Sequence, residues 1–308
     1  MNYEDIETFL TIVVTKNITK AANLLFLSQP TISNRLSALE HELGVSLFVR
    51  KKGNKNIQMT NDGDYFIPIA NRWLALMKET RAMRERQENY KVTLGCTDSL
   101  SVAFLVPFYR QLINDKEKSI DICVRTHWSS ELYGMLEDHE IDIAFVYNNL
   151  YFKNVHTEKY FQEKLYIVQN AQPVIKKDKI HTKELDPNKE IFLSWGDTYH
   201  IWHDQWITEA NNHRIDVDTI AIAIQLWQEN DEHWMIMPAS AIKFFSQFRP
   251  FYVSEIENAP PDRICYKVVS KTDNIFISRS LAYFTQKMDA FLKTTNFDIP
   301  LGICFHLR

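Results

Sequence analysis

The segment from Ser28 to Leu36 constrains the fold of this chain more than any other part of it. It reads Ser-Gln-Pro-Thr-Ile-Ser-Asn-Arg-Leu, which suits the start of a helix. Ser28 can accept from a free backbone N–H of the first turn, and Pro30 fits there because the N–H it lacks would be unpaired anyway. Polar side chains crowd this end, and an apolar face follows: Ile32, Leu36, Leu39 and Leu43. A helix with two such faces can pack on a partner helix and enter the major groove of DNA.

Two shorter helices are predicted before this one. Apolar residues at helical spacing predict a first helix over residues 4–15: Ile6, Phe9, Leu10 and Val13. Thr19 is expected to cap the second helix, in which Ala21 and Ala22 are small enough for two helices to cross closely. The third helix is expected to end near Leu43, because Gly44 suits the left-handed conformation that stops a helix.

The polar face of the third helix carries side chains that can read or position DNA. Gln29 and Asn34 can form paired hydrogen bonds with adenine, and Arg35 can do so with guanine. Thr31 and Ser33 suit phosphate oxygens. The alternative is an ordinary amphipathic helix with a solvated face. The predicted DNA-binding residues of this region are Thr19, Ser28, Gln29, Pro30, Thr31, Ser33, Asn34 and Arg35.

A basic turn follows the third helix. Residues 47–50 and 57–60 alternate apolar and polar side chains, which predicts two strands joined by a Gly-Asn turn. This hairpin is a candidate wing that contacts the DNA backbone or minor groove through Arg50, Lys51, Lys52 and Lys55. The alternative is a solvated charge run. Residues 1–91 hold 13 Lys and Arg against 10 Asp and Glu, whereas the remainder holds 22 against 29, so only the front of the chain is basic.

The series of matches through residue 63 resembles the winged helix-turn-helix of the LysR-type transcriptional regulators. The matching residues are Phe9, Ala21, Ala22, Leu27 to Pro30, Ser33, Leu39, Glu40, Leu43, Gly44, Leu47, Phe48, Arg50, Thr60 and Gly63. Asn34 and Arg35 stand where the family often has Arg or Gln followed by Gln, and residues 61–63 replace the usual Glu-Ala-Gly. We expect these departures to alter the preferred operator bases and not the docking mode.

A long helix is predicted over residues 61–89, after the DNA-binding domain of residues 1–60. Its apolar residues follow steps of three and four, the spacing of a helix that pairs with another helix: Phe66, Ile69, Trp73, Leu76, Thr80 and Met83. The alternative is a helix packed on its own domain. The resemblance implies that two copies dimerise through this seam, which would present two recognition helices to a roughly two-fold operator.

Residues 90–308 alternate strands with helices, which predicts an α/β domain with a mainly parallel sheet. The expected strands cover 92–96, 120–124, 142–146, 164–168, 190–193, 234–237 and 265–269, and the expected helices cover 102–112, 130–139, 199–210, 220–228, 240–248 and 278–292. The resemblance implies an effector domain built like a periplasmic binding protein, with two Rossmann-like lobes: lobe I over 91–162 and 268–308, and lobe II over 163–267. Residues 229–234 depart from a segment that is Gly-rich in the family.

Polar and aromatic residues follow several of these strands, at the end where ligands bind in open α/β sheets. Their hydroxyl groups and nearby backbone amides can hold a carboxylate, and the tryptophans can stack on a flat ligand. The alternatives are helix capping for each Ser and core packing for each Trp. The predicted effector-binding residues are Thr97, Ser99, Trp128, Ser129, Tyr147, Asn148, Ser194 and Trp195.

Other chemistry finds less support. No nucleophile elbow, P-loop or dinucleotide fingerprint is present. His200 and His203 could pair on a metal, but no third ligand has suitable spacing, which favours surface histidines. The cysteines Cys96, Cys123, Cys265 and Cys304 are far apart, which favours reduced, mostly buried thiols. We therefore expect no metal or cofactor and no enzymatic activity.

Two hypotheses remain. The first is a cytoplasmic LysR-type regulator, a homodimer or homotetramer whose partners are double-stranded promoter DNA, a small-molecule effector and RNA polymerase. The acidic N-terminus and the lack of a long apolar run argue against export and against a membrane partner. The second is a solute-binding protein or α/β enzyme with an incidental N-terminal helical domain.

Overall fold

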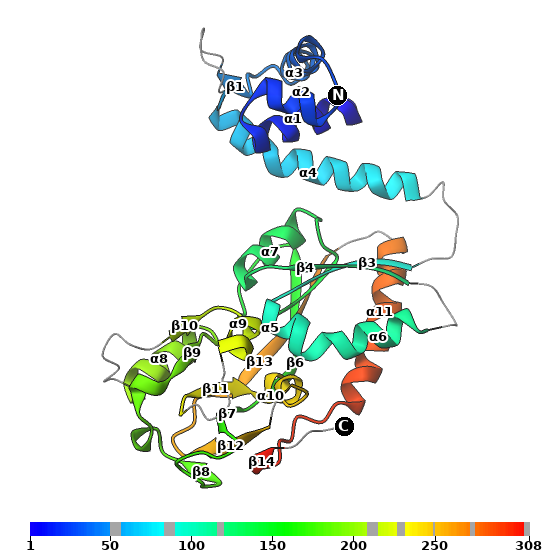
Figure 1. Ribbon diagram of the computed structural model, residues 1–308. Helices are drawn as coiled ribbons and strands as arrows, with labels where there is room; N and C mark the ends of the chain where they lie inside the picture. Colours follow the sequence, from blue (N-terminus) through cyan, green and yellow to red (C-terminus); the bar gives the residue numbers. More distant parts are fainter. Residues whose placement is uncertain are drawn as a thin grey trace. The chain divides into compact units, whose positions relative to one another are not determined.

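The computed structural model describes residues 1–49, 57–82, 90–115, 120–207, 215–226, 232–248, 250–271 and 275–304 (Figure 1). The chain divides into two compact units, one formed mainly by residues 1–88 and the other by most of residues 89–308. In the described ranges no helix is long and apolar enough to cross a membrane. The predicted wing residues Arg50, Lys51, Lys52 and Lys55, and Met83 of the predicted seam, lie outside the described residues.

The first unit is a small helical domain with a short hairpin. Its elements are α1 (Tyr3–Thr15), α2 (Ile18–Leu24), α3 (Gln29–Leu43), β1 (Phe48–Val49), β2 (Gln58–Met59) and α4 (Asn61–Ala82). β1 and β2 pair antiparallel. Phe9 lies in the core, with its ring centroid 5.6 Å from that of Phe48 and 5.1 Å from that of Phe66. The core of this unit therefore contains side chains from the hairpin and from α4 as well as from α1 to α3.

The ends of α2 and α3 are fixed by their caps. Ser28 caps α3 as predicted, accepting from the Thr31 N–H at 3.3 Å, and Gly44 ends it with a φ of 71°. Thr19 is not a cap, which corrects the prediction. Asn17 caps α2 instead, accepting from the Lys20 N–H at 3.0 Å, because the helix begins at Ile18 and leaves Thr19 inside its first turn.

The first half of α4 belongs to the core of its own unit. Phe66 is buried against Phe9, and Trp73 is half-buried against the same cluster. Phe66 is therefore a correction to the predicted seam, because its side chain is already used within the domain. Ile69 is 40% exposed, Leu76 is 53% exposed, and Thr80 is also exposed, so the free apolar surface of α4 is narrower than the spacing predicted.

The second unit begins with a five-stranded sheet that we call lobe I. Its strands lie in the order β4 (Ile120–Thr126), β3 (Tyr90–Cys96), β5 (Ile143–Val146), β13 (Arg263–Ser270) and β6 (Val155–Glu163). Its helical segments are α5 (Asp98–Leu100), the π-helical segment η1 (Ser101–Leu105), α6 (Val106–Ile113), α7 (Ser129–Glu137) and α11 (Ile275–Thr294). Phe284 and Met288 of α11 lie in the core of this lobe. β3 runs parallel to β4 and β5, whereas β13 runs antiparallel to β5 and β6.

The second sheet, with the small elements around it, forms lobe II. Its strands are β11 (Trp234–Pro238), β7 (Leu165–Asn170), β12 (Phe251–Ile256), β14 (Gly302–Cys304) and β8 (Lys179–Ile180), and β9 (Ile191–Leu193) pairs in parallel with β10 (Ile215–Val217). Its helices are η2 (Thr182–Glu184), η3 (Pro187–Lys189), α8 (Asp197–Trp206), α9 (Ile220–Leu226) and α10 (Ala239–Phe245). β7 is antiparallel to both β11 and β12.

Two expectations about the sheets are wrong. The sheets are not mainly parallel, because β6 pairs antiparallel with β13 and β12 pairs antiparallel with β7 and β14, and the sequence pattern missed both β6 and β12. The predicted lobe boundary after residue 267 is also displaced: the whole of β13 from Arg263 pairs within lobe I, and β14 returns the end of the chain to lobe II. Each lobe is thus completed by a strand that follows a segment of the other lobe in the sequence: β13 completes lobe I and β14 completes lobe II.

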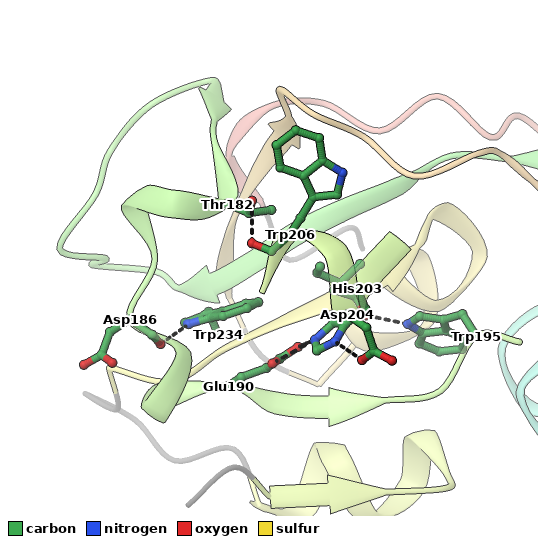
Figure 2. Close-up of polar contacts among 9 residues, drawn as sticks. Thr182, Asp186, Glu190, Trp195, His203, Asp204, Trp206 and Trp234 are labelled. Atoms are coloured by element: carbon green, nitrogen blue, oxygen red, sulfur yellow. Dashed lines mark hydrogen bonds and ion pairs between the residues drawn. The ribbon is translucent and has the colours of Figure 1, made fainter. Parts of the chain in front are cut away.

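Lobe II contains a buried polar cluster (Figure 2). His203 is fully buried, and its Nε2 lies 2.8 and 3.0 Å from the two carboxylate oxygens of Glu190. Trp195 donates from Nε1 to the Ile236 carbonyl at 2.7 Å, and Trp234 donates to the Asp186 carbonyl at 2.8 Å. The sequence favoured a surface position for His203, and this is wrong, because His203 is buried and pairs with Glu190, the residue before β9. The described residues contain no group of three or more His, Cys, Asp or Glu that could hold a metal ion.

Candidate functional site

The first candidate site is the exposed face at the start of α3. Thr19, Ser28, Gln29, Pro30 and Asn34 are exposed there. The Thr19 hydroxyl donates to Gln29 Oε1 at 3.3 Å, so α2 and α3 contribute to one polar surface. The predicted side chains of the two helices therefore stand together on the face that the sequence assigned to DNA.

Three of the predicted DNA-binding residues are half-buried, and two of them, Thr31 and Arg35, have side-chain partners within the domain. Thr31 lies with its hydroxyl oxygen 2.8 Å from Ser28 Oγ, so these two hydroxyls bind each other at the helix start. Arg35 is 21% exposed and its guanidinium lies 2.6 Å from a carboxylate oxygen of Glu4 in α1. Ser33 is half-buried. Gln29 and Asn34 therefore remain the exposed amides of this face, whereas Arg35 is held back against α1.

The second candidate site is a cavity of about 620 Å³ in the second unit. It is lined by residues of both lobes, and all eight predicted effector-binding residues contribute to it: Thr97, Ser99, Trp128, Ser129, Tyr147, Asn148, Ser194 and Trp195. In lobe I they follow β3, β4 and β5, neighbouring strands whose carboxyl ends meet at one edge of the sheet. Lobe II contributes the turn between β9 and α8.

Local hydrogen bonds fix several lining residues. Ser129 is buried at the start of α7 and accepts from the Tyr147 N–H at 3.4 Å, which ties two lobe I loops together. Ser194 Oγ lies 2.7 Å from His200 Nε2. Gly196 caps α8 with a φ of 104°, a conformation that favours glycine, and this turn places Ser194 and Trp195 at the cavity.

The two tryptophans of the site differ in environment. Trp128 is 60% exposed, so its ring is free to contact a ligand. Trp195 is 5% exposed and anchored to the Ile236 carbonyl, which agrees with the core-packing alternative for this residue. Trp195 nevertheless lines the cavity, where its ring faces the guanidinium of Arg263.

Arg263, which sequence reasoning missed, lines the same cavity. Its guanidinium carbon is 3.3 Å from the centroid of the Tyr147 ring and 4.7 Å from that of Trp195. Nη2 donates to Ser99 Oγ at 3.4 Å, and Nη1 lies 3.7 Å from Glu163 Oε1. The sequence offered only a lone Arg before a predicted strand, and nothing in the spacing connected it with Ser99, 164 residues earlier.

Glu163 joins the two lobes beside this cation. Its carboxylate is fully buried and accepts from the Tyr147 hydroxyl at 3.0 Å and from the Ser240 N–H at 2.9 Å. Tyr147 follows the lobe I strand β5, whereas Ser240 lies in the first turn of α10 in lobe II. Burial raises the pKa of Tyr147 well above its usual value, only partly opposed by Arg263, so the phenol remains a donor to Glu163.

Acidic residues also line the cavity, and the sequence prediction did not include them. They are Asp98, Glu131, Asp197 and Asp218. Burial raises the pKa of Asp98, and repulsion by the Asp218 carboxylate raises it further. Asp98 Oδ2 is buried and has no hydrogen-bond partner among the described residues. The site therefore contains one caged cation and several carboxylates.

Comparison with known proteins places these two sites in one class, a winged helix-turn-helix joined to an effector-binding domain. Residues 3–64 match the bacterial regulatory helix-turn-helix protein, lysR family, and residues 85–266 match the LysR substrate binding domain. The second match alone covers more than half of the chain, so the chain belongs to the LysR family of transcriptional regulators.

Individual relatives agree with this assignment. The chain is 29% identical over 218 residues to a probable RuBisCO transcriptional regulator of Phaeodactylum tricornutum, covering 68% of this chain and 69% of that protein. It is 31% identical over 147 residues to the HTH-type transcriptional regulator HdfR of Yersinia pestis, covering 46% of this chain and 48% of that protein, so it spans about half the length of HdfR. The structure of full-length CbnR with its target DNA is 18% identical with a TM-score of 0.67, covering 94% of this chain and all of CbnR.

The family, the fold class and the broad function predicted from the sequence are thereby confirmed. The chain is a LysR-type DNA-binding transcriptional regulator with an effector-binding domain. The alternative of a solute-binding protein or enzyme with an incidental helical domain is set aside, because both parts of the chain match the same family.

Proposed function

We propose that this regulator binds promoter DNA through the start of α3, as a homodimer or homotetramer, and that a small molecule in the cavity between the lobes controls it. The observation that carries this proposal is the cavity of about 620 Å³, which is lined by both lobes. A ligand that contacts both lobes stabilises the arrangement in which they lie closest, and so shifts the population of conformations.

The DNA-binding part of the proposal rests on the exposed polar face. Gln29 and Asn34 are exposed amides near the helix start, where recognition helices contact base edges. We also assign phosphate contacts to Arg50, Lys51, Lys52 and Lys55, because basic side chains neutralise the DNA backbone. CbnR, whose fold this chain shares, holds its target DNA in the solved complex.

The regulatory output follows from the same arrangement. We propose that the dimer forms through the exposed part of α4 and acts in the cytoplasm, where promoter DNA lies. A change in the lobes alters the contacts with promoter DNA or with RNA polymerase. The protein then works by binding and conformational change, without a catalytic step.

The DNA assignment is tested by fluorescence anisotropy with a fragment of the DNA upstream of the gene. Gln29→Ala and Asn34→Ala should each reduce the preference for this fragment over scrambled DNA about 10-fold, the loss that one good pair of base contacts supplies. His41→Ala is the control, because His41 is exposed in the last turn of the same helix. If both amide variants keep the full preference while binding with normal affinity, the start of α3 does not read this DNA.

A further inference from the structure

Arg263 has far fewer hydrogen-bond acceptors than its buried position requires. A guanidinium carries five N–H donors. Its side chain is 9% exposed, and its one hydrogen bond within the described residues is the long contact to Ser99 Oγ at 3.4 Å. Nε is buried without any partner there, and Glu163 at 3.7 Å is beyond hydrogen-bond distance. A buried donor left unpaired is destabilising, so the site lacks an acceptor that a bound ligand can supply.

The cage around Arg263 sets the kind of acceptor that fits. Tyr147 and Trp195 present their rings to the guanidinium and hold its plane in place. A fixed planar fork of donors matches the two oxygens of a carboxylate better than it matches a single acceptor. The geometry therefore favours a ligand carboxylate at Arg263, close to the hydroxyl groups of Thr97 and Ser99, which also line the cavity.

Asp98 has the opposite deficiency to Arg263, because its buried carboxylate oxygen lacks a hydrogen-bond donor among the described residues. Asp98 begins α5 in lobe I, and Asp218 precedes α9 in lobe II, so the two carboxylates come to the cavity from different lobes. Oδ2 of Asp98 is buried and unpartnered within the described residues, and burial, with a smaller contribution from repulsion by Asp218, raises the pKa of Asp98. A cation between two such carboxylates removes the repulsion and gives the buried oxygen a donor.

The charges that line the cavity favour a ligand with a cationic group over a simple dianion. Arg263 is offset by the fully buried Glu163 beside it. The remaining ionisable lining then includes Asp98, Glu131, Asp197 and Asp218 on the acidic side. The acidic residues at the starts of α5 and α8 suit those helix ends, which favour negative charge. The unsatisfied guanidinium in the same cavity has no such explanation.

From these contacts we infer that the ligand is a small zwitterion, an amino acid or close relative with a second cationic group, whose carboxylate binds Arg263 and whose cation lies between Asp98 and Asp218. This inference rests on the proposed function, because it names the chemical class of the molecule that occupies the effector cavity.

The test uses the full-length protein and isothermal titration calorimetry with three matched sets of probes. L-ornithine, L-lysine and L-arginine carry both groups, cadaverine lacks the carboxylate, and glutarate lacks the cation. At least one of the three amino acids should bind, and it should bind at least 10-fold more tightly than cadaverine or glutarate. Asp98→Asn, Asp218→Asn and Arg263→Lys should each weaken this binding at least 10-fold.

A matched control separates the site from general charge. Asp121→Asn removes the same charge from an exposed position on β4 that does not line the cavity, and it should leave the titration unchanged. Thermal unfolding without probes shows whether each variant is folded. Asp98→Asn should unfold at the wild-type temperature or slightly above it, because the substitution removes the repulsion from Asp218.

Two results would overturn the inference. One is that glutarate binds more tightly than every amino acid and that Asp98→Asn strengthens its binding. The other is that none of the three amino acids binds. Promoter anisotropy in the same samples keeps the proposed function separate: if glutarate changes promoter binding, effector control stands and only the ligand class is wrong. If Gln29→Ala also leaves promoter preference unchanged, the proposed DNA contact is wrong, whatever the ligand.

Discussion

The guanidinium of Arg35 in the recognition helix lies 2.6 Å from a carboxylate oxygen of Glu4 in α1. Arg35 was predicted to contact guanine, yet in this structure its charge is directed toward the helix behind it. Glu4 is exposed, so the ion pair forms at the surface and contributes a modest free energy, roughly 0.2–1 kcal/mol. DNA phosphates and base edges therefore compete with Glu4 for this side chain.

Removing Glu4 should strengthen DNA binding. We expect Glu4→Gln to raise affinity for the upstream fragment a few-fold, because it both frees Arg35 and removes a negative charge near the DNA-binding face. Glu7→Gln is the control, because it removes the same charge from α1 without a side-chain contact to Arg35. Anisotropy titrations at one salt concentration measure both. Equal gains in the two variants would show that general charge, not the Arg35 pair, sets the affinity.

The exposed part of α4 should carry the dimer contact. Leu76 is 53% exposed, so Leu76→Asp should shift sedimentation velocity toward the monomer without unfolding the first unit. Phe66→Leu, in contrast, alters the domain core and should lower thermal stability while the dimer persists. A Leu76→Asp protein that sediments like the wild type would place the dimer contact elsewhere.

Two glycines near Leu132 should respond in opposite directions. A Cβ on Gly95 would lie 2.4 Å from Ile141 Cδ1 and 2.5 Å from Leu132 Cδ2, both in buried side chains, so Gly95→Ala should cost about 1–3 kcal/mol. Gly134 lies inside α7 with no atom within 4 Å of such a Cβ, so Gly134→Ala should stabilise by about 0.5–1 kcal/mol. Urea unfolding midpoints measure both, and equal shifts would contradict the close packing at Gly95.

Thiol reactivity should follow burial. Burial raises the pKa of Cys96 to about 11 and that of Cys265 well above its usual value, so both stay protonated and slow to alkylate at pH 8. Cys123 is half-buried and should react faster with iodoacetamide, as peptide mass spectrometry would show. Equal labelling of Cys96 and Cys123 at pH 8 would contradict this order of reactivity.

Burial of Cys96 also makes the free energy of unfolding depend on pH. The folded protein keeps the Cys96 proton that the unfolded chain loses near pH 9, so the stability contributed by this group should fall between pH 9 and about 11.

The sequence predicted the elements whose causes are local. The Ser28 cap, the Gly44 stop and the polar face of α3 depend on residues within a few positions of one another. The eight cavity residues were also predictable, because the carboxyl ends of neighbouring strands meet at one edge of a sheet. Thr19 failed as a cap because two competent capping residues, Asn17 and Thr19, stand close together and the backbone uses the first.

The features that were missed depend on contacts across long stretches of chain. β6 carries His156, Glu158 and Lys159 among its apolar residues, so it lacks the apolar run that marked the other strands. Its place in the sheet comes from pairing with β13 about a hundred residues later. Arg263 likewise acquires its role from a distant partner, Ser99, which no short motif indicates.

Arg263 and Glu163 are also direct neighbours in the β-sheet register, and this position has a mechanical meaning. β6 ends at Glu163, two residues before β7 begins in lobe II, and β13 begins at Arg263, after the chain has left β12 of lobe II. The ion pair therefore lies where two of the chain segments that connect the lobes meet. A ligand bound at Arg263 therefore acts beside two of the chain segments that connect the lobes, so even a very small ligand can influence both lobes.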